Sequence, residues 1–359
     1  MEPLVDQYGR GIRHLEAGPA VFETWLAAAV TGGGGAHPPR GTTFFDTRLG
    51  LAVRRWCPPL LGLEPHCAPV RYLARRRELG AYAAGRALLR GSGIGTFLVA
   101  DGPGESPGSG DTARPVEDPA LLAGAGRPAH RTVRLEPLAD RTAAASDTVA
   151  GFVSGLAEAV HTASRTAAAF VCDGGFPADA PPEPGEVRRA AARRLRGEGR
   201  RTDPVLVRHL LWSALVTGRP LQLRCADPGP LAGFLRATAG LGPPVVLLPS
   251  APHHRAAARL AAAFPHVYTD IGPRPAETMD EAPFGKLLFS TGARGLPELY
   301  VVAARLFTRE MERLLSGWVE EGDCARRDAR RIAGMVGGGT ARRLYRLGPD
   351  TGSAGAAGD

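Results

Sequence analysis

Lysine is almost absent from this 359-residue chain, although lysine and arginine together number 44. Lys286 is the single lysine, so arginine carries nearly all of the positive charge. An excess of arginine, alanine and glycine indicates a GC-rich coding sequence, and we therefore discount the net charge of +8 as a sign of nucleic-acid binding. The arginine-rich run at 188–201 contains no aromatic residue, which favours a solvated helix face and no nucleic-acid partner.

Long apolar runs are also missing. No stretch approaches 18 consecutive apolar residues, so the sequence predicts no transmembrane helix and no membrane partner. The first seven residues, Met-Glu-Pro-Leu-Val-Asp-Gln, have neither the basic start nor the apolar core of a signal peptide. We therefore expect a cytoplasmic protein.

Cysteine is scarce, and its spacing excludes the common metal and redox motifs. The five cysteines are scattered and form no Cys-x-x-Cys pair. In a chain that we expect in the cytoplasm, this pattern predicts free thiols and no disulfide. The residues are Cys57, Cys67, Cys172, Cys225 and Cys324.

The sequence does contain a regular alternation of short apolar runs with helical segments. Eight such runs predict strands that begin near residues 4, 93, 130, 168, 221, 244, 267 and 286. Strands that alternate with helices predict an α/β fold, here a (β/α)8 TIM barrel. A length of 359 residues suits one such domain, which we place at 1–346. The small residues of 347–359 predict a disordered tail.

The last predicted strand leads into a polar turn. Leu287–Phe289 is a short apolar run, and Ser290–Gly295 follows it directly. Pro297 and Glu298 stand where a new helix would begin. Because a TIM barrel places its chemistry at the carboxyl ends of the strands, we expect Ser290–Gly295 to line the pocket.

Several phrases resemble the amidohydrolase superfamily, in the actinobacterial form of the branch called amidohydrolase-related or amidohydrolase 2. They are Thr-Thr-Phe-Phe-Asp at 42–46, Arg-Arg-Trp-Cys-Pro-Pro-Leu-Leu-Gly-Leu-Glu-Pro at 54–65, Arg-His-Leu-Leu-Trp at 208–212 and Gly-Lys-Leu-Leu-Phe-Ser-Thr at 285–291. The resemblance extends over about residues 4–346. It implies a TIM barrel and a hydrolase that uses a divalent metal. It also implies a small cap insertion at about 41–70, which we expect to cover the barrel mouth.

The positions at which that family binds its metal carry other residues here. The two histidines after the family's first strand correspond to Tyr8 and Arg10, and its last-strand aspartate corresponds to Gly292. The remaining positions correspond to Val171, Arg224 and Pro249. Arginine is always charged and has no lone pair to donate. We therefore predict no metal and no other cofactor.

Arginine takes over part of this predicted site. Arg10 and Arg224 stand at ligand positions, and Arg294 lies two residues past Gly292. Because strand ends converge in a barrel and arginine binds carboxylate and phosphate in bidentate fashion, these residues predict a pocket for an anionic small molecule. A pocket closed by internal salt bridges accounts for the same arginines equally well. In that case the arginines would pair with Asp6, Asp101 or Asp270.

Three hypotheses for the function stay open. The first is a barrel without catalysis that binds a small anionic molecule or a partner, with a homo-oligomer left open. The second is a metal-independent lyase, isomerase or condensation enzyme whose acid and base groups are Tyr8, Asp101, Glu136 and Asp270. The third is an active metal-dependent hydrolase with relocated ligands, drawn from His37, His66, His253 and His254.

Overall fold

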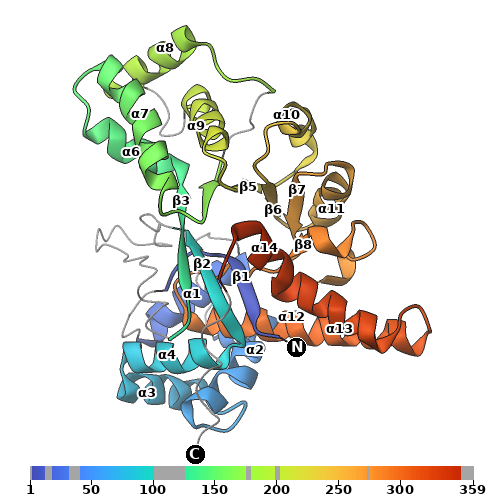
Figure 1. Ribbon diagram of the computed structural model, residues 1–359. Helices are drawn as coiled ribbons and strands as arrows, with labels where there is room; N and C mark the ends of the chain where they lie inside the picture. Colours follow the sequence, from blue (N-terminus) through green and yellow to red (C-terminus); the bar gives the residue numbers. More distant parts are fainter. Residues whose placement is uncertain are drawn as a thin grey trace, which may run out of the picture.

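The computed structural model of the protein describes residues 2–12, 18–31, 41–100, 126–174, 179–198, 203–272 and 275–348. Its strands form one eight-stranded sheet in the order β1 to β8, and every neighbouring pair is parallel (Figure 1). The strands are β1 (Leu4–Gly9), β2 (Ile94–Ala100), β3 (Ala129–Arg134), β4 (Ala169–Cys172), β5 (Leu221–Cys225), β6 (Val245–Pro249), β7 (Val267–Asp270) and β8 (Leu287–Leu288). Beyond Gly348, the predicted tail lies outside the described residues.

The sheet closes between β1 and the residues that follow β8. The backbone amide of Gln7 donates to the carbonyl of Phe289 at 3.2 Å. The amide of Gly292 donates to the carbonyl of Tyr8 at 3.0 Å, and that of Arg10 to the carbonyl of Ala293 at 2.8 Å. With these bonds the ring of parallel strands is complete, and the predicted (β/α)8 TIM barrel is confirmed.

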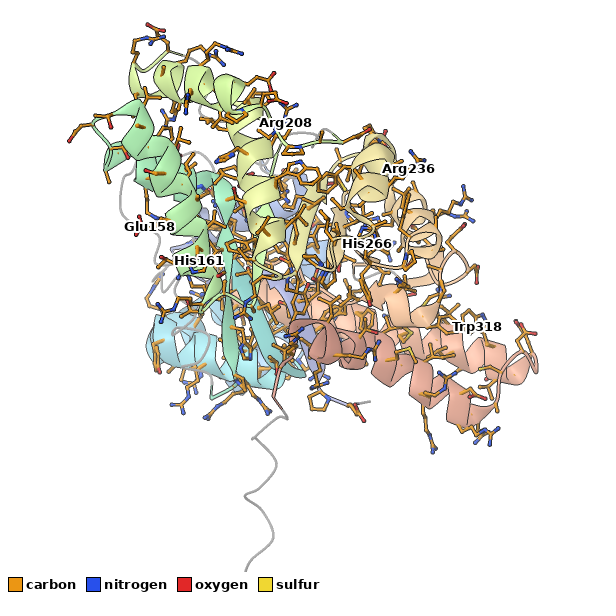
Figure 2. All side chains as sticks on the ribbon, turned by 45° about the horizontal axis from the view of Figure 1, so that its top comes forward. Glu158, His161, Arg208, Arg236, His266 and Trp318 are labelled. Atoms are coloured by element: carbon orange, nitrogen blue, oxygen red, sulfur yellow. The ribbon has the colours of Figure 1, made fainter. Side chains whose placement is uncertain are left out.

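Helices occupy the connections and surround the strands (Figure 1). They are α1 (Pro19–Thr31), α2 (Arg48–Trp56), α3 (Pro69–Leu79), α4 (Ala81–Gly91), α6 (Leu135–Ala144), α7 (Val149–Ser164), α8 (Pro184–Leu195), α9 (Pro204–Val216), α10 (Ala232–Thr238), α11 (His254–Ala263), α12 (Pro297–Glu320), α13 (Arg326–Gly334) and α14 (Thr340–Tyr345). Many charged side chains lie on these outer helices, among them Arg236 on α10 (Figure 2). None of the helices within the described ranges has the length and hydropathy needed to cross a bilayer.

Local chemistry explains where several helices begin and end. Proline occupies the first position of α3, α8, α9 and α12. An N–H group at this position has no acceptor within the helix, so proline, which lacks the group, costs no hydrogen bond there. The segment 72–89, which its pattern predicts as one helix, forms two helices because Gly80 adopts a φ of 77° between them. The pattern of residues 130–136 predicts a strand that includes Glu136, but the third strand ends at Arg134, so Glu136 lies in the first turn of α6.

The interior of the barrel is filled from its amino-terminal end. Alternate strand residues form an apolar cluster with Tyr345 of α14; the cluster includes Val5, Leu98, Val171, Val246, Leu248 and Leu288. The amide nitrogen of Gln222 donates to the Tyr345 hydroxyl at 2.8 Å, and that hydroxyl donates to Oε1 of Gln7 at 2.7 Å. Helix α14 therefore plugs the amino-terminal end, and the carboxyl ends of the strands remain for a site. All five cysteines are free thiols, as predicted.

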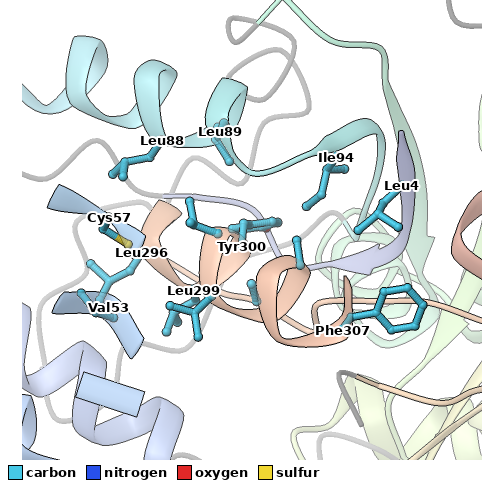
Figure 3. Packing of buried hydrophobic residues seen from close by; sticks show 14 of the residues in the cluster. Leu4, Val53, Cys57, Leu88, Leu89, Ile94, Leu296, Leu299, Tyr300 and Phe307 are labelled. Carbon is cyan, nitrogen blue, oxygen red and sulfur yellow. The ribbon is translucent and has the colours of Figure 1, made fainter. Parts of the chain in front are cut away.

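The predicted cap insertion lies along the outside of the barrel. It contains α2 and a 3-10 turn at Pro58–Leu61, and these pack against α4 and α12. Figure 3 shows Val53 and Cys57 of this segment beside Leu88 and Leu299. Its apolar residues are buried as expected, but against the outer helices, which offer more apolar surface than the polar strand ends. A position over the barrel mouth is therefore wrong for the described residues.

Candidate functional site

Four charged side chains meet at the carboxyl ends of the strands. Asp173 follows β4, and its Oδ2 accepts a hydrogen bond from Nε of Arg134, the last residue of β3, at 2.5 Å. Nη2 of Arg10, which follows β1, lies 3.6 Å from the same oxygen. Nη1 of Arg224 in β5 donates to Oδ1 at 3.3 Å. We call Arg10, Arg134, Arg224 and Asp173 the mouth cluster.

The mouth cluster carries a net positive charge, because three guanidinium groups face one carboxylate. Burial alone would raise the pKa of Asp173, but Arg134, Arg10 and Arg224 together outweigh burial and hold this pKa below its usual range. The cluster is also accessible to solvent. The exposed fraction of the side chain is 13% for Arg134 and 39% for Arg224.

Tyr8 is buried beside this cluster. Burial raises the pKa of its hydroxyl to about 12, even though the positive charges of Arg10, Arg224 and Arg134 act in the opposite direction. The hydroxyl has no hydrogen-bond partner among the described residues. A neutral phenol with an unused donor therefore stands next to three guanidinium groups.

Glu136 supports the cluster from the first turn of α6. Its Oε1 accepts hydrogen bonds from the backbone amides of Asp173 at 2.7 Å and Gly174 at 3.2 Å, and from the thiol of Cys172 at 3.2 Å. Burial and the nearby charge of Asp173 raise the pKa of Glu136. This carboxylate fixes the turn after β4 and so positions Asp173.

Two other predicted carboxylates lie deeper and pair with no arginine among the described residues. Asp6 accepts hydrogen bonds from the amide and the hydroxyl of Thr291, at 2.8 and 2.6 Å. Asp270 accepts from Nε2 of Gln7 at 3.3 Å and from the amide of Gly272 at 3.2 Å. Burial raises the pKa of Asp6 to about 6 and that of Asp270 to about 7. Salt bridges from these two residues to the arginines, one form of the closed pocket, are therefore wrong.

The remaining predicted site residues have other surroundings. The Val171 side chain belongs to the apolar interior, and Pro249 is buried at the end of β6. Gly292 has a φ of 57°, which favours glycine, and its amide helps to close the barrel. Arg294 stacks over Trp25, 5.9 Å from the ring centroid, instead of joining the mouth cluster. Asp101 lies outside the described residues.

Sequence reasoning therefore missed two members of the mouth cluster, Arg134 and Asp173. Both have a signal in the sequence, because each stands at or just after the end of a predicted strand. Asp173 lies 39 residues after Arg134 and 51 residues before Arg224 along the chain. Only the order of the strands brings these three residues together. The turn Ser290–Gly295 lies at the strand ends as predicted, but its backbone serves mainly to close the ring.

The residues at the family's metal positions do not fit a divalent cation. Arg10 and Arg224 place positive charge where a metal would need lone pairs, and Val171, Pro249 and Gly292 offer no side-chain donor. The described residues contain no group of three His, Cys, Asp or Glu side chains that could hold a metal ion. Of the proposed relocated ligands, His66 is exposed and His37 lies outside the described part of the chain.

Comparisons with known proteins agree with this architecture. The sequence matches no family model. It is 31% identical over 115 residues to the protein fluG of Emericella nidulans, a match that spans 29% of this chain and only 13% of that relative. A protein from Lactobacillus casei described as a metal-dependent hydrolase superimposes with a TM-score of 0.75 at 17% identity, over 98% of this chain and 96% of its own.

A second solved structure, glucuronate isomerase from Caulobacter crescentus, gives a TM-score of 0.60 at 14% identity, over 97% of this chain and 92% of its own. The fold is a (β/α)8 TIM barrel, which superimposes on both of these solved structures. At these identities the likeness concerns the fold alone, and the function has to be argued from the site.

Proposed function

We propose that this amidohydrolase-like barrel binds a small anionic molecule, a carboxylate or a phosphate, at the mouth cluster and does not catalyse metal-dependent hydrolysis. The observation that supports this function is the ratio of charges at the strand ends. Arg10, Arg134 and Arg224 share the single carboxylate of Asp173. Even with Glu136 ionised, the local charge stays positive.

The geometry suits an anion because of how the arginines are held. Each guanidinium group presents several N–H donors in one plane. Asp173 accepts a hydrogen bond from Arg134 and from Arg224, and lies 3.6 Å from Arg10. The partial burial of the cluster strengthens charge-assisted hydrogen bonds relative to those in water. In this proposal Asp173 holds the three side chains together, and the bound anion accepts hydrogen bonds from Arg10 and Arg224.

Thermal unfolding in citrate and in phosphate tests the proposal. A ligand at ~100 times its dissociation constant stabilises the folded state by about 2.7 kcal/mol. Arg224→Gln should abolish this gain because it removes the most exposed arginine of the cluster while leaving the fold intact. Arg255→Gln is the matched control, since Arg255 also carries an ion pair, to Glu281, but lies on α11. The control should keep the full gain.

Asp173→Asn separates a binding pocket from a closed one. If Asp173 competes with the ligand for the arginines, removing its charge should increase the affinity for citrate several-fold. The proposal would be contradicted if no anion raised the melting temperature of the wild type and citrate also failed to raise that of Asp173→Asn. If only the variant responds, Asp173 closes the pocket of the natural protein.

Tyr8 favours one further candidate function, metal-independent catalysis on the bound anion. Its buried hydroxyl has no described hydrogen-bond partner and stands beside the arginines, where it could donate a proton to a substrate. Incubating stabilising acids with the protein and following them by NMR tests this candidate. Tyr8→Phe should keep binding and lose turnover. If the spectra of all bound acids stay unchanged with the wild type, the protein only binds.

A further inference from the structure

A second basic pocket lies at the opposite end of the barrel. The cavity has a volume of about 680 Å³, opens to solvent, and is lined by residues at the starts of the middle strands and at the end of α14. Three of its lining residues are arginines, Arg219, Arg343 and Arg346, and none is acidic. We call this cavity the basal pocket. Cavities of 300 to 1,000 Å³ are typical of small-molecule sites.

The three arginines of the basal pocket have no ion-pair partner among the described residues, in contrast to those of the mouth cluster. Nε of Arg219 donates to the carbonyl of Ser164 at 2.8 Å, which anchors this side chain at the wall. Arg343 and Arg346 are exposed. The pocket therefore concentrates positive charge that no acidic group of the described ranges neutralises.

Two further features shape the pocket. Arg346 follows α14 with a φ of 53°, a left-handed conformation that is costly for residues other than glycine and that turns the chain at the pocket wall. Tyr268 of β7 lines the cavity, and Nζ of Lys286 lies 4.4 Å from the centroid of its ring. One wall residue of the pocket thus contacts a further cation, although the Lys286 ammonium group also donates to the carbonyls of Phe264 and Val267.

We propose that the basal pocket binds a small molecule that carries two or more phosphate groups. Several arginines spaced around one cavity match several anionic groups, and each guanidinium can bind a phosphate in bidentate fashion. A single phosphate would fill little of a cavity of about 680 Å³. Nucleic acid is disfavoured, because single strands need a groove with stacking aromatic residues, and the pocket offers only Tyr268.

Isothermal titration calorimetry of the full chain with inorganic tripolyphosphate tests this proposal. The double variant Arg343→Gln/Arg346→Gly should weaken binding at least about tenfold, since it removes two guanidinium groups that would form charge-assisted hydrogen bonds with the phosphates. Glycine suits the left-handed position 346, so this variant should fold. Arg188→Gln/Arg189→Gln on α8 is the matched control, because both arginines are exposed and form no ion pair with a described residue.

The control should change the affinity for tripolyphosphate less than twofold. Equal weakening by the control would mean that tripolyphosphate responds to overall charge, and weakening by Arg224→Gln would place it at the mouth cluster. Tighter binding of a short single-stranded RNA, lost in the double variant, would make the pocket a nucleic-acid site. Each of these results overturns the proposal, whereas selective loss in the double variant supports it.

Discussion

Three aspartates near the strand ends differ in protonation because their surroundings differ. Asp173 lies among arginines and is partly exposed, so its pKa is held low. Asp6 and Asp270 are fully desolvated and accept hydrogen bonds mainly from neutral groups, so their pKa values rise to about 6 and about 7. The chain therefore keeps one charged carboxylate at the mouth and a weakly acidic pair beneath it.

The raised pKa of Asp270 predicts a pH-dependent stability. A folded-state pKa above the unfolded value, 3.8, means that the folded protein binds the proton more tightly. This contribution to stability is complete below pH 3.8 and is lost as the pH rises through about 7. In Asp270→Asn no ionisation is possible. The variant should therefore gain stability relative to wild type by more than about 1 kcal/mol between pH 5 and 8.

Urea unfolding of both proteins at several pH values measures this difference. The comparison with wild type is needed because burial lowers the pKa of His209 and His254, which makes stability rise with pH in a neighbouring range. These histidine contributions cancel in the difference between the two proteins. A difference that is constant from pH 5 to 8 would show that Asp270 ionises normally.

At the residue scale, the sequence predicted part of the candidate site. Arg10 and Arg224 both lie against Asp173, because a barrel brings the ends of β1 and β5 to one rim. Asp173 has a sequence signal as the residue directly after β4, but its place between the arginines depends on the turn that Glu136 holds. Arg294 was misplaced because its stacking on Trp25 depends on how α1 packs.

Helix α12 is the element that joins the insertion to the barrel. Glu298 in its first turn is completely buried, and its Oε1 accepts hydrogen bonds from the Tyr72 hydroxyl at 2.8 Å and from Nε of Arg76 at 2.9 Å. The side chain of Arg76 is itself only 4% exposed. A carboxylate at a helix amino terminus is further favoured by the helix dipole.

Removing this carboxylate should destabilise the protein strongly. Glu298→Ala leaves the buried guanidinium of Arg76 without its carboxylate partner, and breaking a buried pair in this way costs about 3 to 5 kcal/mol. Glu310→Ala on the same helix is the control, because its partner Arg313 is 73% exposed and such pairs contribute below about 1 kcal/mol. Denaturant unfolding compares the two variants. Similar losses would mean that Glu298 serves only as a helix former.

At the element scale, the sequence predicted the existence of elements better than their arrangement. All eight strands were placed, because short apolar runs between turn residues are a local signal. The break at Gly80 was missed because glycine within a helical pattern signals a break only weakly. The position of the insertion depends on which apolar surface it covers, and this is set by α4 and by α12, which is far away in the sequence.

At the scale of the whole molecule, basic sites lie at both ends of one barrel. The mouth cluster stands at the carboxyl ends of the strands and the basal pocket at their amino-terminal ends. Between them lies the apolar interior, crossed by the hydrogen bonds of Gln7, Gln222 and Tyr345. Because this packed layer separates the two sites, variants at one site should leave the other unchanged, which the paired titrations above can measure.

The last prediction concerns the metal that the resemblance implies. We expect the purified protein to hold no stoichiometric zinc, manganese or iron, because Arg10 and Arg224 repel a cation from the strand ends. Elemental analysis measures the content, and melting curves with and without EDTA should coincide. Zinc added as a control should not raise the melting temperature, whereas citrate should. About one tightly held metal per chain, with a lower melting temperature in EDTA, would instead support a hydrolase whose ligands include residues outside the described ranges, such as His37.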